Sequence, residues 1–375
     1  MKILIAGDLV PTETNEQKFK EGLINSLSDE FKNRWFDSDF RIFNLECPVT
    51  NSIDSINKFG PCLSCSSDCI KGIKNLDPSL LLLSNNHIFD YGIDGIKSTI
   101  DILNRNNIPF TGIINNNKDL NNGYIFEKDN IKVGIYNVCD REFSAATNDR
   151  IGASYLSIKK NYLEIKKLKN ECNYLIIIYH GGKEYYQYPT PELKELSEYF
   201  VEIGGDIVIC QHSHCIGCEE KYKNGTIIYG QGNFIFNYDN ANSLEKNSLI
   251  IDIKFTSKNY NIKYIPIQKS NNLIDISKNN DIIKEFNIRN KEIKDSVILK
   301  KNFDNFSSSM LNNYLSILSK CTLFKRLINK FFIKNYYTKR YSKKDLIKIL
   351  NIVECDAHRE VLINSLKMNI KNRKK

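Results

Sequence analysis

The chain has 375 residues, of which 41% are hydrophobic and 26% are charged. This balance excludes an intrinsically disordered protein, and the length allows one large domain with an appendage. The net charge of +9 is uneven, because residues 301–375 hold 17 Lys and Arg against 5 Asp and Glu. This basic tail could contact nucleic acid, an anionic lipid or an acidic polymer, or it could be a solvated helical face.

Short runs rich in Ile, Leu and Val alternate with amphipathic patterns through the first two thirds of the chain. Bounded runs of this kind predict strands that are buried on both faces of an α/β sheet. In chain order, the predicted strands are residues 2–7, 40–45, 80–83, 132–138, 174–179 and 206–210. Apolar residues at helical spacing predict helices at 92–106 and 191–203.

Beyond Gln211, turn residues separate four further apolar runs, which predict successive antiparallel strands. These strands are residues 226–229, 233–237, 248–255 and 261–267. From about residue 279 the pattern becomes helical, basic and rich in Asn and Lys. We therefore predict one α/β domain at residues 1–278, followed by a basic helical extension at 279–375.

The eleven cysteines are scattered and odd in number, and no secretory signal precedes them. We therefore expect a cytoplasmic protein without a disulfide framework. Two Cys-x-x-Cys pairs, Cys62 with Cys65 and Cys215 with Cys218, could bind zinc or could be small buried or loop residues. No run approaches the roughly 20 apolar residues that cross a bilayer, so we expect no membrane span, although the protein could associate with a membrane through a complex.

Four of the five histidines follow predicted strands. They are His87, His180, His212 and His214, whereas His358 lies in the helical tail, where we expect a structural role. Two further strands end near carboxylates, Asp8 and Glu46. Each residue alone could be an ordinary turn residue. Because ligands bind beyond the carboxyl ends of strands in an open α/β sheet, the joint pattern predicts one metal site.

The ligands in this set are carboxylate, carboxamide and imidazole groups. They suit Mn²⁺, Fe²⁺, Zn²⁺ or Mg²⁺, and the set is large enough for one or two ions. The Glu46 carboxylate could bridge a pair of ions about 4 Å apart, and such a pair activates water for an in-line displacement.

Six short motifs occur in order along residues 2–237. They are Gly7-Asp8, Asn44-Leu45-Glu46-Cys47-Pro48, Asn85-Asn86-His87 followed by Asp90 and Gly92, His180-Gly181-Gly182-Lys183-Glu184-Tyr185, His212-Ser213-His214, and Gly230-Gln231-Gly232-Asn233-Phe234. This ordered set resembles the CapA family of bacterial capsule and poly-γ-glutamate synthesis proteins. That family is similar to calcineurin-like metallophosphoesterases, so the resemblance implies a four-layer αββα sandwich with a dinuclear metal centre.

The resemblance also implies a role for each motif. Asp8 and His214 would bind the first ion, Glu46 would bridge, and Asn86, His180 and His212 would bind the second. His87 would act on the substrate as a catalytic group, and Asp90 would orient its ring or simply cap the next helix. The expected substrate-binding residues are Gly181, Lys183, Glu184, Tyr185 and Asn233, although Asn233 could instead belong to a turn and the charged residues could be solvated.

The motifs depart from phosphoesterases at two positions. Leu9 and Val10 follow Asp8 where phosphoesterases usually offer Asp-x-His, and Glu46 stands where they have Asp. We expect a metal-dependent hydrolase or transferase that acts on a phosphoester or an anionic polymer in capsule, poly-γ-glutamate or polysaccharide biosynthesis. The alternative is a non-catalytic, metal-stabilised subunit of a polymer synthesis or export complex. We do not expect a nucleic-acid substrate, because no basic face interleaved with aromatic residues is apparent near the site.

Overall fold

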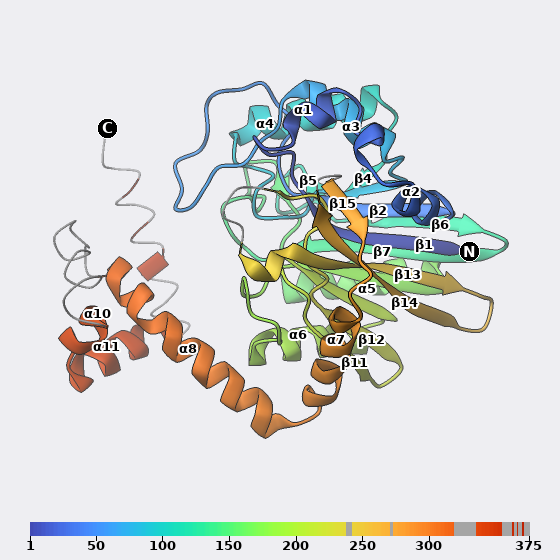
Figure 1. Cartoon of the computed structure of the whole chain (residues 1–375). Coiled ribbons are helices and arrows are strands. Elements are labelled where there is room, and N and C mark those ends of the chain that lie inside the picture. Colours follow the sequence, from blue (N-terminus) through green and yellow to red (C-terminus); the bar gives the residue numbers. More distant parts are fainter. Residues whose placement is uncertain are drawn as a thin grey trace. The chain divides into compact units, whose positions relative to one another are not determined.

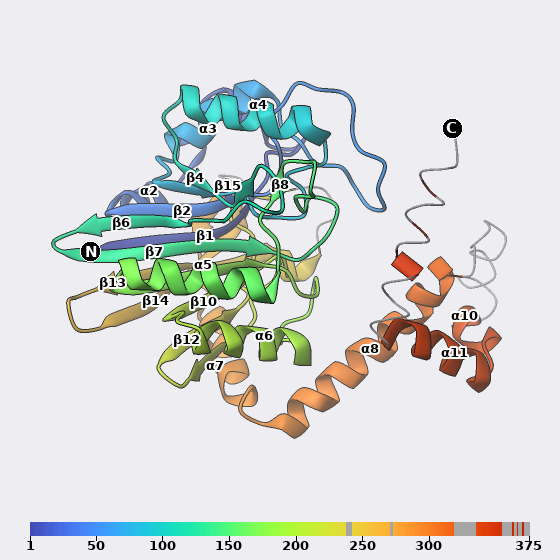
Figure 2. The same cartoon turned by 180° about the vertical axis from the view of Figure 1, so that it is seen from behind.

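The computed structural model describes residues 1–237, 242–270, 273–318 and 335–354, together with 362, 363, 366 and 370. His358 lies outside these residues. The chain divides into two compact units, Met1–Leu299 and Lys300–Lys375. The first unit contains every strand found in the described residues and is shown from two sides in Figures 1 and 2.

The first unit contains a seven-stranded sheet and a six-stranded sheet. The first sheet has the order β15 (Leu273–Ile276), β14 (Tyr260–Ser270), β13 (Asn247–Phe255), β1 (Lys2–Leu9), β2 (Phe40–Leu45), β3 (Leu80–Leu82), β4 (Phe110–Thr111). The second has the order β11 (Glu219–Tyr222), β12 (Gly225–Tyr229), β10 (Ile207–Gln211), β9 (Tyr174–His180), β7 (Ile131–Cys139), β6 (Tyr124–Lys128). A separate two-stranded sheet pairs β5 (Ile113–Ile114) with β8 (Gly152–Ala153).

The two large sheets pack face to face through aliphatic side chains. Ile5 and Leu82 of the first sheet belong to the same buried cluster as Ile176 and Ile209 of the second. The alternate residues of the strands face helices on the outside, so both faces of each central strand are buried. This explains why the strands are continuous apolar runs in the sequence.

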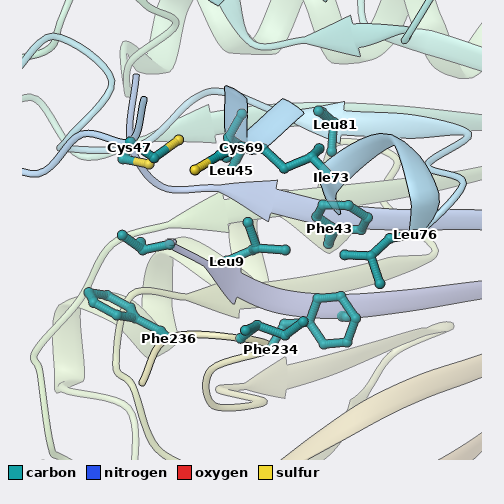
Figure 3. Packing of buried hydrophobic residues seen from close by; sticks show 14 of the residues in the cluster. Leu9, Phe43, Leu45, Cys47, Cys69, Ile73, Leu76, Leu81, Phe234 and Phe236 are labelled. Carbon is teal, nitrogen blue, oxygen red and sulfur yellow. The ribbon is translucent and has the colours of Figure 1, made fainter. Parts of the chain in front are cut away.

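Helices cover the outer face of each sheet, as the two cartoon views show (Figures 1 and 2). On the first sheet lie α1 (Glu16–Lys20), α2 (Asp29–Phe36), α3 (Ile70–Asn75) and α4 (Gly92–Arg105); on the second lie α5 (Ile158–Glu171) and α6 (Pro191–Glu202). Phe43 and Leu81 of the first sheet pack with Ile73 of α3 (Figure 3). The predicted four-layer αββα arrangement is therefore confirmed.

Short 3-10 helices and the C-terminal helices complete the fold. The 3-10 helices are Ile24–Ser26, Ser67–Cys69 and Ser243–Lys246. Helix α7 (Asn280–Glu292) belongs to the first unit, where Ile282 and Phe286 pack with Leu249 of β13. The chain continues through α8 (Ser296–Leu318), α10 (Tyr336–Arg340) and α11 (Lys343–Glu354). Within the described ranges, no helix has both the length and the apolar character that crossing a bilayer requires.

The segment after β12 differs from the sequence-based expectation. The predicted strand at 233–237 is wrong, because this segment forms only an isolated bridge between Leu9 and Ile235. Gly230 and Gly232 have φ values of 116° and 77°, which turn the chain from the second sheet towards the end of β1. The strand predicted at 226–229 exists as β12, which pairs in parallel with β10 and antiparallel with β11. The antiparallel run of the first sheet therefore begins only at β13.

A fragment of residues 1–299 is expected to fold alone and to retain the metal-binding capacity of the full chain. The cluster between the sheets and the clusters beneath the covering helices are built from residues of this unit. Thermal unfolding by circular dichroism and Mn²⁺ titration of the fragment, beside the full chain, would check this. A fragment that folds but does not bind Mn²⁺ when titrated would contradict the expectation.

Candidate metal centre

The candidate site is built from the carboxyl ends of strands in both large sheets. In the first sheet Asp8 of β1 is paired with Asn44 of β2, and in the second Gln211 of β10 is paired with His180 of β9. Glu46 follows β2, the Asn85-Asn86-His87 segment follows β3, and His212 and His214 follow β10. Since the sheets are stacked, these strand ends bring the polar side chains to one place.

Five of the predicted metal ligands form two groups that could each hold an ion. Glu46 lies within 4.8 Å of Asp8 and His180 in one group, and of His212 and His214 in the other, measured between ligand atoms. Glu46 is therefore common to both groups, as a bridging carboxylate would be. All five side chains are buried. The sixth predicted ligand, Asn86, lies beside them, with its Oδ1 atom 3.0 Å from His180 Nε2.

The contacts of Asp8 bear on how the ligands would be divided between two ions. Its Oδ2 atom lies 3.7 Å from His214 Nδ1, which matches the pairing that the family resemblance implies. Its Oδ1 atom lies equally close, 3.7 Å, to His180 Nδ1. The two carboxylate oxygens of Asp8 therefore face the two groups, and Asp8 could contribute to either.

Glu46 provides the test of whether the site fits a cation. Its side chain is fully buried, and among the described residues the contact recorded for its carboxylate is with His180, whose Nε2 atom lies 3.0 Å from Oε1. Burial raises the pKa of Glu46 to about 8, and the nearby Asp8 carboxylate acts in the same direction. A buried carboxylate with so few polar partners is costly for a protein to keep, whereas a divalent cation would satisfy both oxygens. The residues therefore fit a metal ion.

Two of the three histidines, His180 and His212, have lowered pKa values and so favour the neutral form that a metal ligand needs. Burial lowers the pKa of His212 well below its ordinary value, and the neighbouring His180 and His214 lower it further. Burial also lowers the pKa of His180. Burial opposes the charged form of His214, but the carboxylates of Glu46 and Asp8 outweigh it and raise the pKa. His212 Nδ1 is buried without a partner among the described residues, so a neutral His212 offers a lone pair to an ion.

Two asparagines that sequence reasoning did not assign hold the ligands in place. Asn44 donates through Nδ2 to Asp8 Oδ1 at 2.7 Å, and the same atom lies 3.3 Å from His180 Nδ1. Asn85 donates through Nδ2 to Asn44 Oδ1 at 3.0 Å and accepts from the His87 backbone N–H at 3.1 Å. Both lie in the motifs already noted, which was the available signal. They connect the carboxylate of β1 to the turn that carries His87.

His87 contacts a carboxylate and an ammonium group. Its Nδ1 atom lies 2.6 Å from Asp90 Oδ2, and Lys58 Nζ lies 2.5 Å from Asp90 Oδ1 and 3.2 Å from His87 Nδ1. The Lys58 side chain is only 4% exposed. Tyr91 rather than Asp90 is the N-cap residue of α4, so Asp90 does not serve as the helix cap. Lys58 comes from the loop of residues 51–64, whose sequence offered no motif that would have revealed it.

The predicted substrate-binding residues border the metal groups in different ways. Asn233 Oδ1 lies 2.8 Å from His214 Nδ1, so this residue orients a ligand. Glu184 Oε1 lies 4.0 Å from His212 Nε2, and the Tyr185 ring centroid is 5.9 Å from that of His214. Lys183 is half-buried, and its charge contributes to lowering the pKa of His212.

Gly181 is required by its neighbour Asp140. A Cβ atom at Gly181 would lie 2.5 Å from Asp140 Oδ2. Asp140 follows β7, accepts from the Gly182 backbone N–H at 3.1 Å and accepts from the Tyr179 hydroxyl. It is a further strand-end carboxylate that the sequence analysis missed, and it fixes the turn after His180.

The backbone at the two histidines beyond β10 is left-handed. His212 has φ 84° and His214 has φ 55°. Most residues other than glycine rarely adopt this region, although histidine, like Asn and Asp, does so more often than most, and such conformations cluster at functional sites. The left-handed turns allow both imidazoles to enter the same buried site from positions two residues apart.

The cysteine pairs take no part in either metal group of the described residues. Cys65 and Cys69 are buried beneath the helices near Cys47, and Figure 3 shows Cys47 and Cys69 within the hydrophobic cluster. Burial raises the pKa of Cys215 to about 12. These thiols behave as small apolar residues in the structure.

Replacing Asn44 with alanine is expected to weaken metal binding by roughly 10–100-fold, the usual effect of removing a group that orients a ligand. The change removes the donor to Asp8 and the contact with His180. Calorimetric titration with Mn²⁺ would measure it. Asn161→Ala is the matched control, because Asn161 is an equally buried amide that bonds to Tyr136 away from the site. Equal loss of affinity in both variants would contradict a specific role.

Comparison with known proteins gives a family match over most of the first unit. Residues 2–238 match the model of the family described as bacterial capsule synthesis protein PGA_cap. The capsule biosynthesis protein CapA of Bacillus anthracis is 29% identical over 180 residues, which are 46% of this chain and 44% of that protein. The PGA biosynthesis protein CapA of Bacillus subtilis (strain 168) is 25% identical over 231 residues, 60% of this chain and 59% of that protein. The chain thus spans about half the length of the curated relatives it matches.

Solved structures show a weaker likeness. A hypothetical protein from Thermus thermophilus has a TM-score of 0.42 and 12% identity, covering 70% of this chain and 99% of that chain. A second protein of the same organism, TT1561, has a TM-score of 0.37 and 8% identity, covering 70% and 98%.

Proposed function

The chain belongs to the family of bacterial capsule synthesis proteins, and from that premise we propose that it is a metal-dependent hydrolase or transferase of the phosphoesterase type that acts in capsule polymer biosynthesis. The observation that carries this proposal is the fully buried carboxylate of Glu46, which lies in both ligand groups and is approached by His180 Nε2, another predicted ligand, at 3.0 Å. The family accounts for the biological setting, and the ligand set supports the chemistry.

The proposed centre holds one or two divalent ions of Mn, Fe, Zn or Mg. Glu46 would lie between the ions, with Asp8, Asn86, His180, His212 and His214 around them. When bound, such ions supply an activated water and stabilise the charge that develops on the reacting oxygens. The absence of thiolate from the proposed set favours these borderline and hard ions over softer ones.

The chain's own residues would provide acid–base help and orientation. His87 belongs to neither ligand group, and its Nδ1 atom is held by Asp90. With Nδ1–H donated to Asp90, Nε2 is left to exchange a proton with the oxygen of the leaving group. Lys58 offsets the charge of Asp90 and holds the loop of residues 51–64 against the turn of His87. Because the proposed ligands are buried, bulk water is kept away from the reacting groups.

The substrate class that we propose is a phosphoester or an anionic polymer. The two curated relatives are described as proteins of capsule and PGA biosynthesis. Lys183 lies half-buried beside His212, where it could contact an anionic substrate. Glu184 and Tyr185 lie on the same side of the centre.

The proposal is tested by assaying the full chain with Mn²⁺ on a chromogenic phosphomonoester and a chromogenic phosphodiester. Activity that depends on added metal and falls in a His87→Ala variant supports it. A metal-loaded, folded protein without activity on either ester, or on a capsule polymer extracted from a producing bacterium, would overturn the enzymatic part.

The second candidate is a non-catalytic, metal-stabilised subunit of a polymer synthesis or export complex. The observation that favours it is the apolar pair Leu9 and Val10, which is buried where phosphoesterases usually place a histidine ligand. Under this reading metal binding raises the melting temperature, and His87→Ala changes neither metal content nor any turnover.

A further inference from the structure

The second unit, Lys300–Lys375, exposes an unusual number of large apolar side chains. We use the name C-terminal apolar face for Ile347, Leu350, Leu362, Leu366 and Ile370. Their exposed fractions are 56%, 57%, 41%, 54% and 70%, respectively. Scattered single exposures are normal on a protein surface, but repeated exposure within one short segment marks a surface that binds something.

The spacing of these residues places them on helical faces. Ile347 and Leu350 are three residues apart on α11, which puts them on the same side of that helix. Leu362, Leu366 and Ile370 recur every four residues, and each has helical backbone conformation. Ile347 and Leu350 therefore form a stripe along α11, and the spacing of the other three residues is that of one side of a helix.

The same unit is strongly basic. Residues 301–375 carry 17 Lys and Arg against 5 Asp and Glu. On α11, Lys343, Lys344 and Lys348 are exposed beside the apolar stripe. A hollow of about 470 Å³ in this unit is lined by two cations, Arg340 and Lys348, together with Tyr341, Asp345 and Ile349.

We propose that the second unit docks on an anionic lipid bilayer, with the C-terminal apolar face entering the boundary between headgroups and acyl chains. Apolar stripes flanked by Lys and Arg are the pattern of helices that lie in a membrane surface. Clustered basic residues are attracted to anionic headgroups, and the hollow between Arg340 and Lys348 would accept a phosphate group. Nucleic acid or an acidic polymer would be attracted by the Lys and Arg side chains, but it would leave the exposed apolar side chains in contact with water.

This mode of binding differs from a membrane span. No helix within the described part of the chain could cross a bilayer. Binding would therefore be peripheral, reversible and weakened by salt. The proposal does not depend on the proposed enzymatic function, because none of its residues belongs to the metal centre.

Flotation of the full chain with lipid vesicles tests the proposal. We expect binding to vesicles of phosphatidylcholine with 30% phosphatidylglycerol, at least tenfold weaker binding to phosphatidylcholine alone, and release at high salt. Leu350→Asp and Leu366→Asp should each weaken binding at least tenfold, and Lys343→Glu with Lys344→Glu should do the same.

The matched controls are Ile158→Asp, which alters an exposed apolar residue of the first unit, and Lys254→Glu, which alters an exposed lysine of β13. Both should bind vesicles like the unaltered chain. Circular dichroism and metal content should be unchanged in every variant. Equal binding to neutral and anionic vesicles would overturn the proposal, as would equal binding by Leu350→Asp and Ile158→Asp. Binding of single-stranded RNA without binding of vesicles would also overturn it and would assign the surface to nucleic acid.

Discussion

Replacing His87 with alanine is expected to lower turnover by about 10²–10⁴-fold while bound metal stays near its normal amount, since positioned acid–base groups contribute on that scale. His87 lies outside both ligand groups, and its ring is held by Asp90. Its neighbour Asn86 is the residue whose carboxamide oxygen approaches His180. Adjacent residues at one strand exit do not easily direct both side chains at the same ion.

The comparison variant is His212→Ala. His212 belongs to a ligand group and has a buried nitrogen without a partner among the described residues. This variant should lose metal first and activity in consequence. Metal stoichiometry and turnover measured on both variants separate the roles. Metal loss in His87→Ala equal to that in His212→Ala would show that His87 is a ligand.

Replacing Glu46 with glutamine is expected to stabilise the metal-free protein at pH 8.5 and to destabilise the metal-loaded protein. Burial raises the pKa of Glu46 from 4.5 to about 8 in the folded state. Between these values the unfolded chain releases a proton that the folded protein keeps, so the free energy of unfolding falls as pH rises. The full penalty, on the order of 4 kcal/mol, is reached above about pH 8. Glutamine carries no such penalty.

A bound cation reverses the sign of this effect, because it offsets the charge that burial penalises. Melting temperatures of both proteins at pH 5.5, 7 and 8.5, with Mn²⁺ and with a chelator, measure it. The gain from Glu46→Gln in the chelated protein should grow with pH and disappear towards pH 5. A gain that does not change with pH would show that the Glu46 carboxylate is solvated and is not a ligand.

The strands, and the grouping of the candidate ligands, were predictable because each leaves a local mark in the sequence. Strand β2 has the predicted bounds, residues 40–45. The helix predicted at 92–106 starts where α4 starts, at Gly92, and its predicted end is one residue beyond Arg105, where α4 ends. Burial on both faces makes such strands continuous apolar runs, and the chemistry lies where each run stops. The metal ligands could therefore be proposed without knowing which strands are neighbours.

The groups that support the ligands were not predictable in the same way. Lys58 reaches Asp90 from a loop without periodicity, and Asp140 follows a strand whose exit carries no histidine. Asn44 lies inside a strand, where an amide usually has only a packing role. The strand expected at 233–237 failed because two left-handed glycines redirect the chain across the end of β1. Each of these features depends on contacts between segments that are far apart in the sequence.

The left-handed backbone at His212 and His214 has a consequence for how this family can change over evolutionary time. Glycine or asparagine would adopt these φ values with less strain, so the fold itself would tolerate the loss of either imidazole. A gene copy freed from selection for chemistry could therefore lose its ligands by single substitutions and still express well. Screens for abundance or solubility would not detect the loss. Among natural relatives, the residues at these two positions should distinguish chains that keep the proposed metal centre from chains that retain only the scaffold.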